Sequence, residues 1–251
     1  MAESIREQIK IISPTYKRAG NVKAVEVFQD NLILACHEFE AEDYRKAYPS
    51  NELMVMPDDI GGNMAKVRNY IRDNCGTRYL VMVDDDVAEI GYHENLERYP
   101  IGIMAIYDFL EVGFKIAEDV GTILWGINLQ ADPKFYREYS PFSFLAPVLG
   151  PFSCHIVENT KQVRYDERLG LNEDYDFALQ VAHQYHKIFR NNKYYYLAGH
   201  LTEQGGCGAY RVLDEEKRQA EIMKKKWGEK VVSYNFKKTT NPRIKIPLKG
   251  I

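Results

Sequence analysis

The sequence predicts an α/β fold built on a mixed, mainly parallel sheet with helices on both faces. Short apolar runs alternate with amphipathic segments through the first half of the chain, the pattern of repeated strand–helix–strand units. One run, residues 79–83, is apolar throughout, as expected of a parallel strand covered on both faces. With 251 residues and 29.1 kDa, the chain can bury a sizeable core as one large domain, with or without a small appendage.

The first half of the chain contains most of the predicted sheet. Strands are expected at residues 9–12, 32–36, 53–56 and 79–83, with helices beginning near Asn21, Glu42 and Asn63. Asn21 is a suitable N-cap, and two glycines at 61–62 break the chain before the third helix. A longer helix and a strand at 122–127 should follow, because one helical face collects Ile103, Ile106, Leu110, Phe114 and Ala117.

The second half is less regular. Residues 132–150 contain three prolines and many aromatic side chains, which favours the wall or lid of a pocket. A helix should begin at Glu173, and a strand ending at His200 should precede a glycine-rich loop at 205–211. We therefore expect a main domain at residues 1–212, and a C-terminal helix and basic tail at 213–251 packed on it or extending from it.

The charge is unevenly distributed along the chain. From Lys217 to the end there are eleven lysines and arginines against two acids, a local net charge of +9 that leaves −12 for the preceding part. A basic end on an acidic body suggests a polyanionic partner such as nucleic acid. A solvated helix face followed by a loose tail explains the same pattern without a partner.

Composition also bears on location. No apolar stretch approaches the roughly 20 residues needed to span a bilayer, and the N-terminus lacks a signal-peptide core. We expect a cytoplasmic protein with no membrane partner. The four cysteines are widely separated and form no CxxC pair, so zinc ribbons and redox motifs are not indicated and the thiols should be reduced.

Three carboxylates, Asp84, Asp85 and Asp86, directly follow the apolar strand at 79–83. Ligands of open α/β sheets bind just beyond the carboxyl ends of such strands. Hard divalent cations prefer oxygen ligands and often carry phosphates. The cluster therefore predicts a metal and phosphate site, the alternative being a solvated turn rich in aspartate.

Two further groups of residues carry candidate chemistry. Glu173 and Asp174 open a helix, where a carboxylate could act as general base; capping by Asn172 with early acids would explain them without a function. His200 could be a late metal ligand or an ordinary loop histidine, and Arg211 could clamp a phosphate. The loop at 205–211 is not a Walker A sequence. His183 and His186 are spaced to share a metal, but exposed polar positions explain them equally well.

Four motifs in this order resemble those of GT-A glycosyltransferases over residues 9–211. They are Ile-Ser-Pro-Thr-Tyr-Lys-Arg at 12–18, Lys-Val-Arg-Asn at 66–69, the DXD-like Val-Asp-Asp-Asp at 83–86 and the xED-like Asn-Glu-Asp at 172–174. The resemblance implies the GT-A fold, a Rossmann-like mixed sheet. It also implies site residues: nucleotide or phosphate contacts from Thr15, Arg18, Glu38, Glu40, Arg68, Asp84, Asp85 and Arg211; metal ligands Asp84, Asp86 and His200; and catalytic acids Asp174 and Glu173, with Asp174 the base of an inverting enzyme.

A narrower set of motifs is similar to the TET-associated glycosyltransferases of bacteriophages. The set comprises residues 124–128, 150–152, 173–177 and 205–211. This resemblance implies transfer of a sugar from a nucleotide sugar, with UDP-sugar expected, to 5-hydroxymethylcytosine in phage DNA inside the host cytoplasm, with Mn²⁺ or Mg²⁺. The basic tail would then grip phosphates. An extruded base could stack on aromatic residues that ordinary core packing also explains: Phe135, Tyr136, Tyr139, Phe142 and Phe144.

Several other functions fit parts of the pattern. A nucleotide-sugar pyrophosphorylase should carry a glycine-rich loop after the first strand, where this chain has residues 14–18 without glycine. A two-metal nuclease, a non-catalytic nucleotide- or DNA-binding module, and a glycosyltransferase acting on a glycan or protein remain alternatives. The sequence leaves open whether the anomeric centre is inverted or retained.

Overall fold

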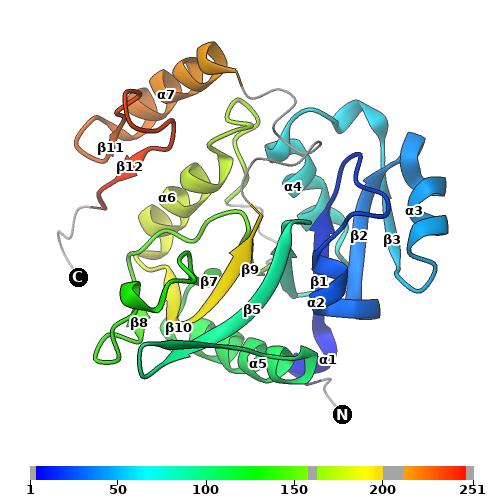
Figure 1. The fold of residues 1–251 in the computed structure, drawn as a ribbon. Helices are drawn as coiled ribbons and strands as arrows, with labels where there is room; N and C mark the ends of the chain where they lie inside the picture. Colours follow the sequence, from blue (N-terminus) through cyan, green and yellow to red (C-terminus); the bar gives the residue numbers. More distant parts are fainter. Residues whose placement is uncertain (1–3, 158–162, 200–211, 247–251) are drawn as a thin grey trace.

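A computed structural model describes residues 4–157, 163–199 and 212–246. It shows a large sheet of strand order β3-β2-β1-β4-β9-β7-β10-β5-β6, with β8 beside β10 (Figure 1). The strands of this sheet are β1 Ile9–Pro14, β2 Leu32–His37, β3 Leu53–Met56, β4 Tyr79–Val83, β5 Val87–Glu94, β6 Glu97–Pro100, β7 Leu124–Asn128, β8 Phe142–Ser143, β9 Phe152–Ile156 and β10 Phe189–Ala198. The helices are α1 Ile5–Gln8, α2 Ala24–Phe28, α3 Ala41–Ala47, α4 Met64–Asn74, α5 Ile103–Val120, α6 Glu173–Tyr185 and α7 Leu213–Trp227. A separate hairpin joins β11 Val232–Ser233 to β12 Arg243–Ile244.

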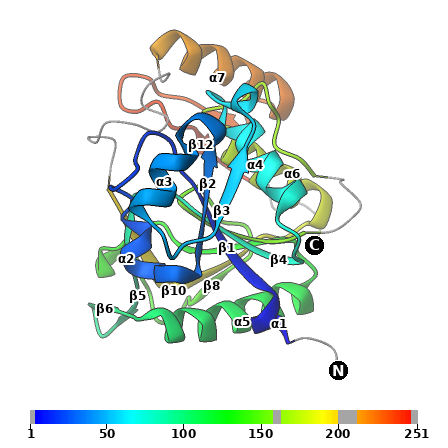
Figure 2. The same cartoon turned by 90° about the vertical axis from the view of Figure 1, so that its right-hand side faces the viewer.

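The predicted α/β class and mixed sheet are confirmed. Strands β1, β2, β3 and β4 are parallel to one another, and β7 is parallel to β10, while β9 runs antiparallel between β4 and β7. The chain moves outward from β1 to β3 and then returns to β4. Right-handed crossovers therefore place α2 and α3 on one side of these strands and α4 on the other (Figure 2). The carboxyl ends of the parallel strands consequently meet at one edge.

Individual elements follow the sequence expectations, with several differences. The helix expected near Asn21 begins at Ala24 with Lys23 as N-cap, because Asn21 instead closes a turn in which its N–H donates to the Arg18 carbonyl at 2.8 Å. The hairpin β5–β6 and strand β9 were not predicted, since neither shows a clear period in isolation. By contrast, α4 begins beside Asn63 as expected, and Asn63 is its N-cap, with a side chain that accepts from the Lys66 N–H at 3.2 Å.

Part of the core lies between the sheet and α5, and buried side chains of α4 and α6 extend it. Strand β4 is buried along its whole length, and the α5 face that carries Ile106, Leu110 and Phe114 is fully buried. At Gly113 a Cβ atom would lie 2.1 Å from the Trp125 ring, so only glycine allows α5 to approach β7 this closely. Cys36, Cys75 and Cys154 are buried free thiols; Cys207 lies outside the described residues.

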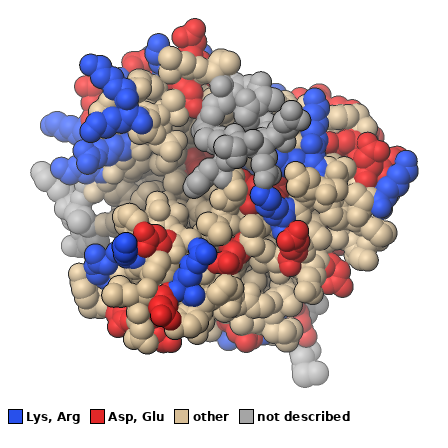
Figure 3. Space-filling model, in the orientation of Figure 1, with Lys and Arg blue, Asp and Glu red and all other residues tan. Residues whose placement is uncertain are grey.

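The C-terminal residues 213–246 are packed against α6. The Asp176 carboxylate, fully buried on α6, accepts hydrogen bonds from Lys226 Nζ at 2.8 Å and from Trp227 Nε1 at 2.7 Å. A small second core joins Leu169 and Leu179 of the main body to Met223 and Val232. Lysine and arginine side chains gather over this part of the molecule (Figure 3). The loose-tail explanation of the basic end is therefore wrong for residues 213–246.

A buried histidine in β9 makes stability depend on pH. His155 is 1% exposed and lies beside the Tyr165 and Phe177 rings. Burial, with added repulsion from Arg72 and Arg68, holds its pKa well below the usual 6.5. Below pH 6.5 the unfolded chain therefore binds a proton that the folded chain rejects, and each further pH unit costs up to about 1.4 kcal/mol of stability.

We expect His155→Gln to lose less stability than the unmodified protein between pH 7 and pH 5. Urea unfolding at both pH values measures the difference. The control is His183→Gln, which removes an exposed histidine instead of a buried one. Equal pH dependence in the His155→Gln variant and the unmodified protein would contradict the prediction.

Candidate active site

The three aspartates form a tight turn where β4 ends. The Asp84 N–H donates to the Pro151 carbonyl at 3.1 Å, and the Val87 N–H donates to the Asp84 carbonyl at 3.2 Å. At the end of β10, the Gly199 N–H donates to the Asp86 carbonyl at 3.0 Å. Asp84 and Asp86 are partly exposed while Asp85 is buried. The first and third carboxylates are thus available to a ligand.

Asp85 joins the acidic turn to the loop after β1. Its carboxylate pairs with Arg18, and its carbonyl accepts from the Ala24 N–H at 3.2 Å. Burial raises the pKa of Asp85 to about 7, against the opposing effect of Arg18. Both residues were predicted from the sequence to contact the donor. The structure brings them together as a largely buried ion pair, which holds the first loop against the turn.

Arg68 links the two acidic motifs. It is 2% exposed; its Nη2 lies 3.0 Å from Asp84 Oδ1 and its Nε lies 3.2 Å from Glu173 Oε1. Its Nη1 also donates to the Gly150 carbonyl at 3.4 Å. Burial, followed by repulsion from Asp174, raises the pKa of Glu173 to about 8. Acids distant in the sequence therefore form one charge cluster around a buried guanidinium.

Asp174 lies in the first turn of α6, beside this cluster. Its Oδ2 accepts from the Gly150 N–H at 3.0 Å and its Oδ1 from the Tyr175 N–H at 2.7 Å. It is partly exposed, whereas Glu173 is buried, and burial raises the pKa of Asp174 above its usual value. Asn172 occupies the N-cap position without a side-chain capping bond; its Oδ1 accepts from the Tyr234 hydroxyl at 3.3 Å. Of the two acids, Asp174 is the more accessible to a substrate.

The donor set at the end of β4 suits a hard divalent cation. Asp84 and Asp86 offer carboxylate oxygens, which Mg²⁺ and Mn²⁺ prefer. Within the described ranges, no group of three or more histidine, cysteine, aspartate or glutamate residues is arranged to hold a metal ion. A cation here would complete its shell with water or phosphate oxygens, as Mg²⁺ commonly does. His200, the predicted third ligand, and Arg211 lie outside the described residues.

Comparison with known proteins identifies the family. A model of the TET-associated glycosyltransferase family matches residues 9–207. The chain belongs to this family. Among solved structures, the fold is similar to mannosyltransferase PcManGT from Pyrobaculum calidifontis in complex with GDP-Man and Mn²⁺, with TM-score 0.55 and 13% identity over 86% of this chain. This chain spans 61% of that protein.

The two resemblances noted in the sequence are thereby confirmed. The α/β fold of this TET-associated glycosyltransferase is similar to that of the solved mannosyltransferase. No curated protein matches the chain in a sequence search. Among the described residues, no helix is both long enough and apolar enough to cross a membrane. The nuclease and the non-catalytic module are not supported, because the family is one of glycosyltransferases.

In this TET-associated glycosyltransferase the loop after β1 is fastened by buried side chains. Thr15 Oγ1 lies 2.8 Å from the Tyr44 hydroxyl, which also accepts from the Arg18 N–H at 3.0 Å. Glu40 is buried and accepts from the Lys17 N–H at 2.8 Å, whereas Glu38 is exposed. Thr15 and Glu40 therefore shape the loop, and Glu38 is the carboxylate of this region that faces solvent.

An aromatic cluster beside this loop was missed by sequence analysis. Phe39, 58% exposed, stacks on His37 with ring centroids 5.9 Å apart, and the Tyr16 ring meets His37 edge-on at 5.7 Å. These residues follow or end β1 and β2 at the same edge of the sheet as Asp84. The signal in the sequence was an aromatic residue just after each of two adjacent strands. An exposed, supported ring at this position is a surface on which a nucleobase can stack.

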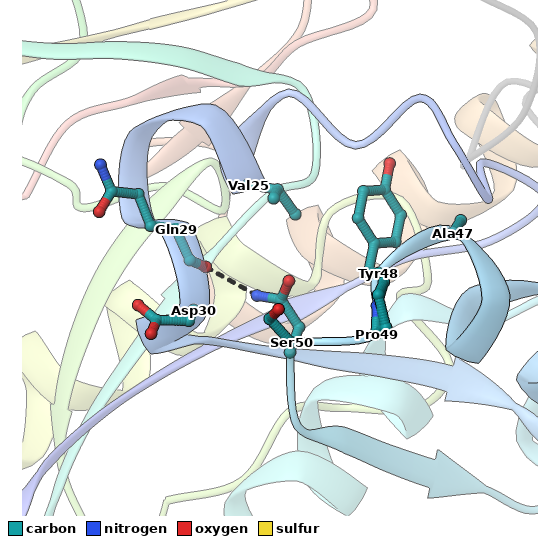
Figure 4. A pocket seen from close by; sticks show the side chains of 8 residues that line it. Val25, Gln29, Asp30, Ala47, Tyr48, Pro49 and Ser50 are labelled. Atoms are coloured by element: carbon teal, nitrogen blue, oxygen red, sulfur yellow. Dashed lines mark hydrogen bonds between the residues drawn. The ribbon is translucent and has the colours of Figure 1, made fainter.

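Among the hollows of the described surface, two differ in their position relative to the site. A hollow of about 360 Å³ is lined by Leu129–Pro133 after β7, by Tyr196–Ala198 at the end of β10 and by Arg98. It adjoins the edge of the sheet where the parallel strands have their carboxyl ends. Asp132 and Pro133, at the start of the irregular segment 132–150, form part of its wall, as expected. A hollow of about 500 Å³ lies between Gln29, Asp30 and Tyr48 (Figure 4). It precedes β2 and β3, at the opposite edge of the sheet, and is not part of this site.

The remaining candidates are dispersed. Tyr136 is buried and stacks on His93, so it is a core residue, whereas Phe135 and Tyr139 are 66% and 86% exposed. His183 and His186 are exposed at the carboxyl end of α6, the opposite end of the helix from Asp174.

Proposed function

We propose that this enzyme transfers a sugar from a nucleotide-sugar donor, a UDP-sugar, to the hydroxymethyl group of 5-hydroxymethylcytosine in DNA, with inversion at the anomeric carbon. One observation carries the proposal: Arg68 gathers the acids of both motifs, Asp84 and Glu173, at the carboxyl edge of the sheet. The acidic residues proposed to bind the donor phosphates and the proposed general base, Asp174, are thereby held in one place. Membership in the TET-associated family supports the DNA acceptor.

The donor would lie along the edge from β2 to β4. Its base would stack on Phe39 beside His37 and Tyr16. Its diphosphate would lie at Asp84 and Asp86, with Mn²⁺ or Mg²⁺ held there and His200 a proposed further ligand. Such a cation neutralises charge on a diphosphate leaving group. The solved mannosyltransferase of similar fold contains GDP-Man and Mn²⁺, which supports this class of donor.

The protein residues would act on the acceptor from α6. Asp174, fixed by two backbone N–H groups, takes the proton of the acceptor hydroxyl as that oxygen bonds to the anomeric carbon. The bond from the anomeric carbon to the diphosphate breaks in the same displacement, and the nucleoside diphosphate leaves with its electron pair. Glu173 and Arg68 position this end of α6 against the turn at Asp84.

The test is release of nucleoside diphosphate over a panel of UDP- and GDP-sugars with Mn²⁺. Three acceptor conditions are compared: a duplex with 5-hydroxymethylcytosine, the same duplex with cytosine, and no DNA. We expect release only with the hydroxymethylated duplex, together with a mass increase of one sugar on that DNA. Release that is indifferent to DNA would overturn the acceptor and point to a glycan or protein.

Asp86→Asn tests the metal. We expect turnover to fall by at least about a hundredfold and the Mn²⁺ concentration at half-maximal activity to rise, because a neutral amide binds a hard cation less well. The exposed Asp59→Asn, on the chain before α4, is the control and should leave both values unchanged. Unaltered Mn²⁺ dependence in Asp86→Asn would remove Asp86 from the metal site.

A further inference from the structure

The end of α7 and the β11–β12 hairpin, which pack against α6, are rich in cationic side chains. Residues 225–246 contain seven lysines and arginines against a single acid, Glu229. Lys226 is used internally, bound to Asp166 and Asp176. The six others are exposed and form no ion pair with any residue in the described ranges: Lys225, Lys230, Lys237, Lys238, Arg243 and Lys245. Elsewhere on the C-terminal helix, by contrast, Arg218 and Lys224 are paired with acids of the same helix.

The fold places two of these cations, Arg243 and Lys245, on the exposed side of the hairpin. In the β11–β12 hairpin Val232 pairs with Ile244, and Val232 is buried in the small core shared with α6. The alternating partners Ser233 and Arg243 consequently point outward, and Lys245 follows two residues after Arg243 on the same side. Figure 3 shows Lys and Arg side chains clustered where Figure 1 places α7 and this hairpin. Exposed, and without an ion-pair partner in the part of the chain that the structure describes, these cations offer phosphate contacts at little desolvation cost.

An aromatic pair connects this face to the helix of Asp174. The rings of Tyr234 and Phe236 are stacked, with centroids 5.4 Å apart and planes 11° from parallel. The Tyr234 hydroxyl donates to Asn172 Oδ1, and Asn172 immediately precedes Glu173 and Asp174. Phe236 is partly exposed and is followed by Lys237 and Lys238. Stacked rings beside cations are the combination that binds nucleic-acid strands, through bases and phosphates together.

We propose that the outer face of residues 228–246 is the acceptor-binding surface of the enzyme, where cations hold the phosphates of a nucleic-acid strand and the Tyr234–Phe236 pair stacks a base. This inference rests on the proposed DNA acceptor and adds where that acceptor lies. It differs from the sequence expectation, which assigned base stacking to the aromatic residues of 135–144. The surface lies outside the residues matched by the family model.

The charge part is tested with two double variants. We expect Lys237→Ala with Lys238→Ala, and Arg243→Ala with Lys245→Ala, each to raise the KM for hydroxymethylated duplex about tenfold at 0.1 M salt. The slope of log binding constant against log salt should become shallower by about 2, since each phosphate contact contributes about 0.9. The control removes Lys46 and Lys115 instead, which lie on α3 and α5, and should change neither value.

The stacking part is tested with Phe236→Leu, which keeps an apolar side chain at a partly buried position. We expect about a tenfold weaker binding of hydroxymethylated DNA. Phe135→Leu, in the irregular segment, should bind as the unmodified enzyme does. Unchanged thermal unfolding shows that each variant is folded.

The two proposals fail in different ways. If the unmodified enzyme transfers sugar to no DNA, the proposed acceptor and this surface are both overturned. If it transfers sugar to hydroxymethylated DNA while the hairpin variants keep its KM and salt slope, only the surface is overturned. Donor-binding affinity, measured without DNA, should be the same in all hairpin variants.

Discussion

Replacing Asp174 with asparagine is expected to lower kcat by about a hundredfold to ten-thousandfold, the usual range for loss of a general base. An asparagine has a single side-chain oxygen, so it can keep one of the two backbone hydrogen bonds, that from the Gly150 N–H, while the other bond and the ability to take a proton are lost. Donor affinity should change little. Steady-state kinetics with hydroxymethylated DNA and a separate donor titration measure the two effects.

Glu173→Gln is the matched control, because it changes the neighbouring acid in the same motif. Glu173 is buried and bonded to Arg68, so its change should reduce kcat by a smaller factor. Activity of the unmodified enzyme should also fall as the pH drops through the pKa of Asp174, which burial holds above its usual 3.8. A larger loss of kcat in Glu173→Gln than in Asp174→Asn would reverse the assignment of the base.

Arg68→Met should destabilise the fold by about 3 to 5 kcal/mol, because it leaves the Asp84 carboxylate and the buried acid Glu173 without the guanidinium that binds both. Adding Glu173→Gln to this variant should restore part of that loss, since it removes one of the uncompensated acids. The free energy of unfolding in urea at pH 7 measures both. The surface pair of Arg45 with Glu42 is the comparison, and Arg45→Met should cost less than about 1 kcal/mol. A cost for Arg68→Met as small as that for Arg45→Met would show that Arg68 is not structural.

The sequence was sufficient for the parallel half of the sheet and for the position of the acidic turn. Strands such as β4 are continuous apolar runs, and Asp84–Asp86 stand directly at the end of one. Strand β9 escaped prediction because its register is set by two neighbours, β4 and β7, that are distant in the chain. Local pattern carries no information about such partners.

The site shows the same division between local and long-range information. Asp174 and Asp84 were singled out as residue types in familiar motifs, but nothing in the sequence indicated that Arg68 would bind both motifs at once. Arg68 was expected at the donor, and the structure places it 2% exposed between Asp84 and Glu173. Whether it also contacts a donor remains a prediction. The role of Asp176 was equally hidden, since its partners Lys226 and Trp227 lie about fifty residues further along the chain.

The hydrogen bonds that hold Asp176 limit how far the enzyme can be shortened from its C-terminal side. The family match ends at residue 207, yet the carboxylate that fastens the middle of α6 finds its partners at Lys226 and Trp227. A protein shortened to the matched region would keep every acidic motif and lose the backing of the helix that bears Asp174. We therefore expect the smallest active fragment to be longer than the matched region, with its C-terminal limit beyond Trp227.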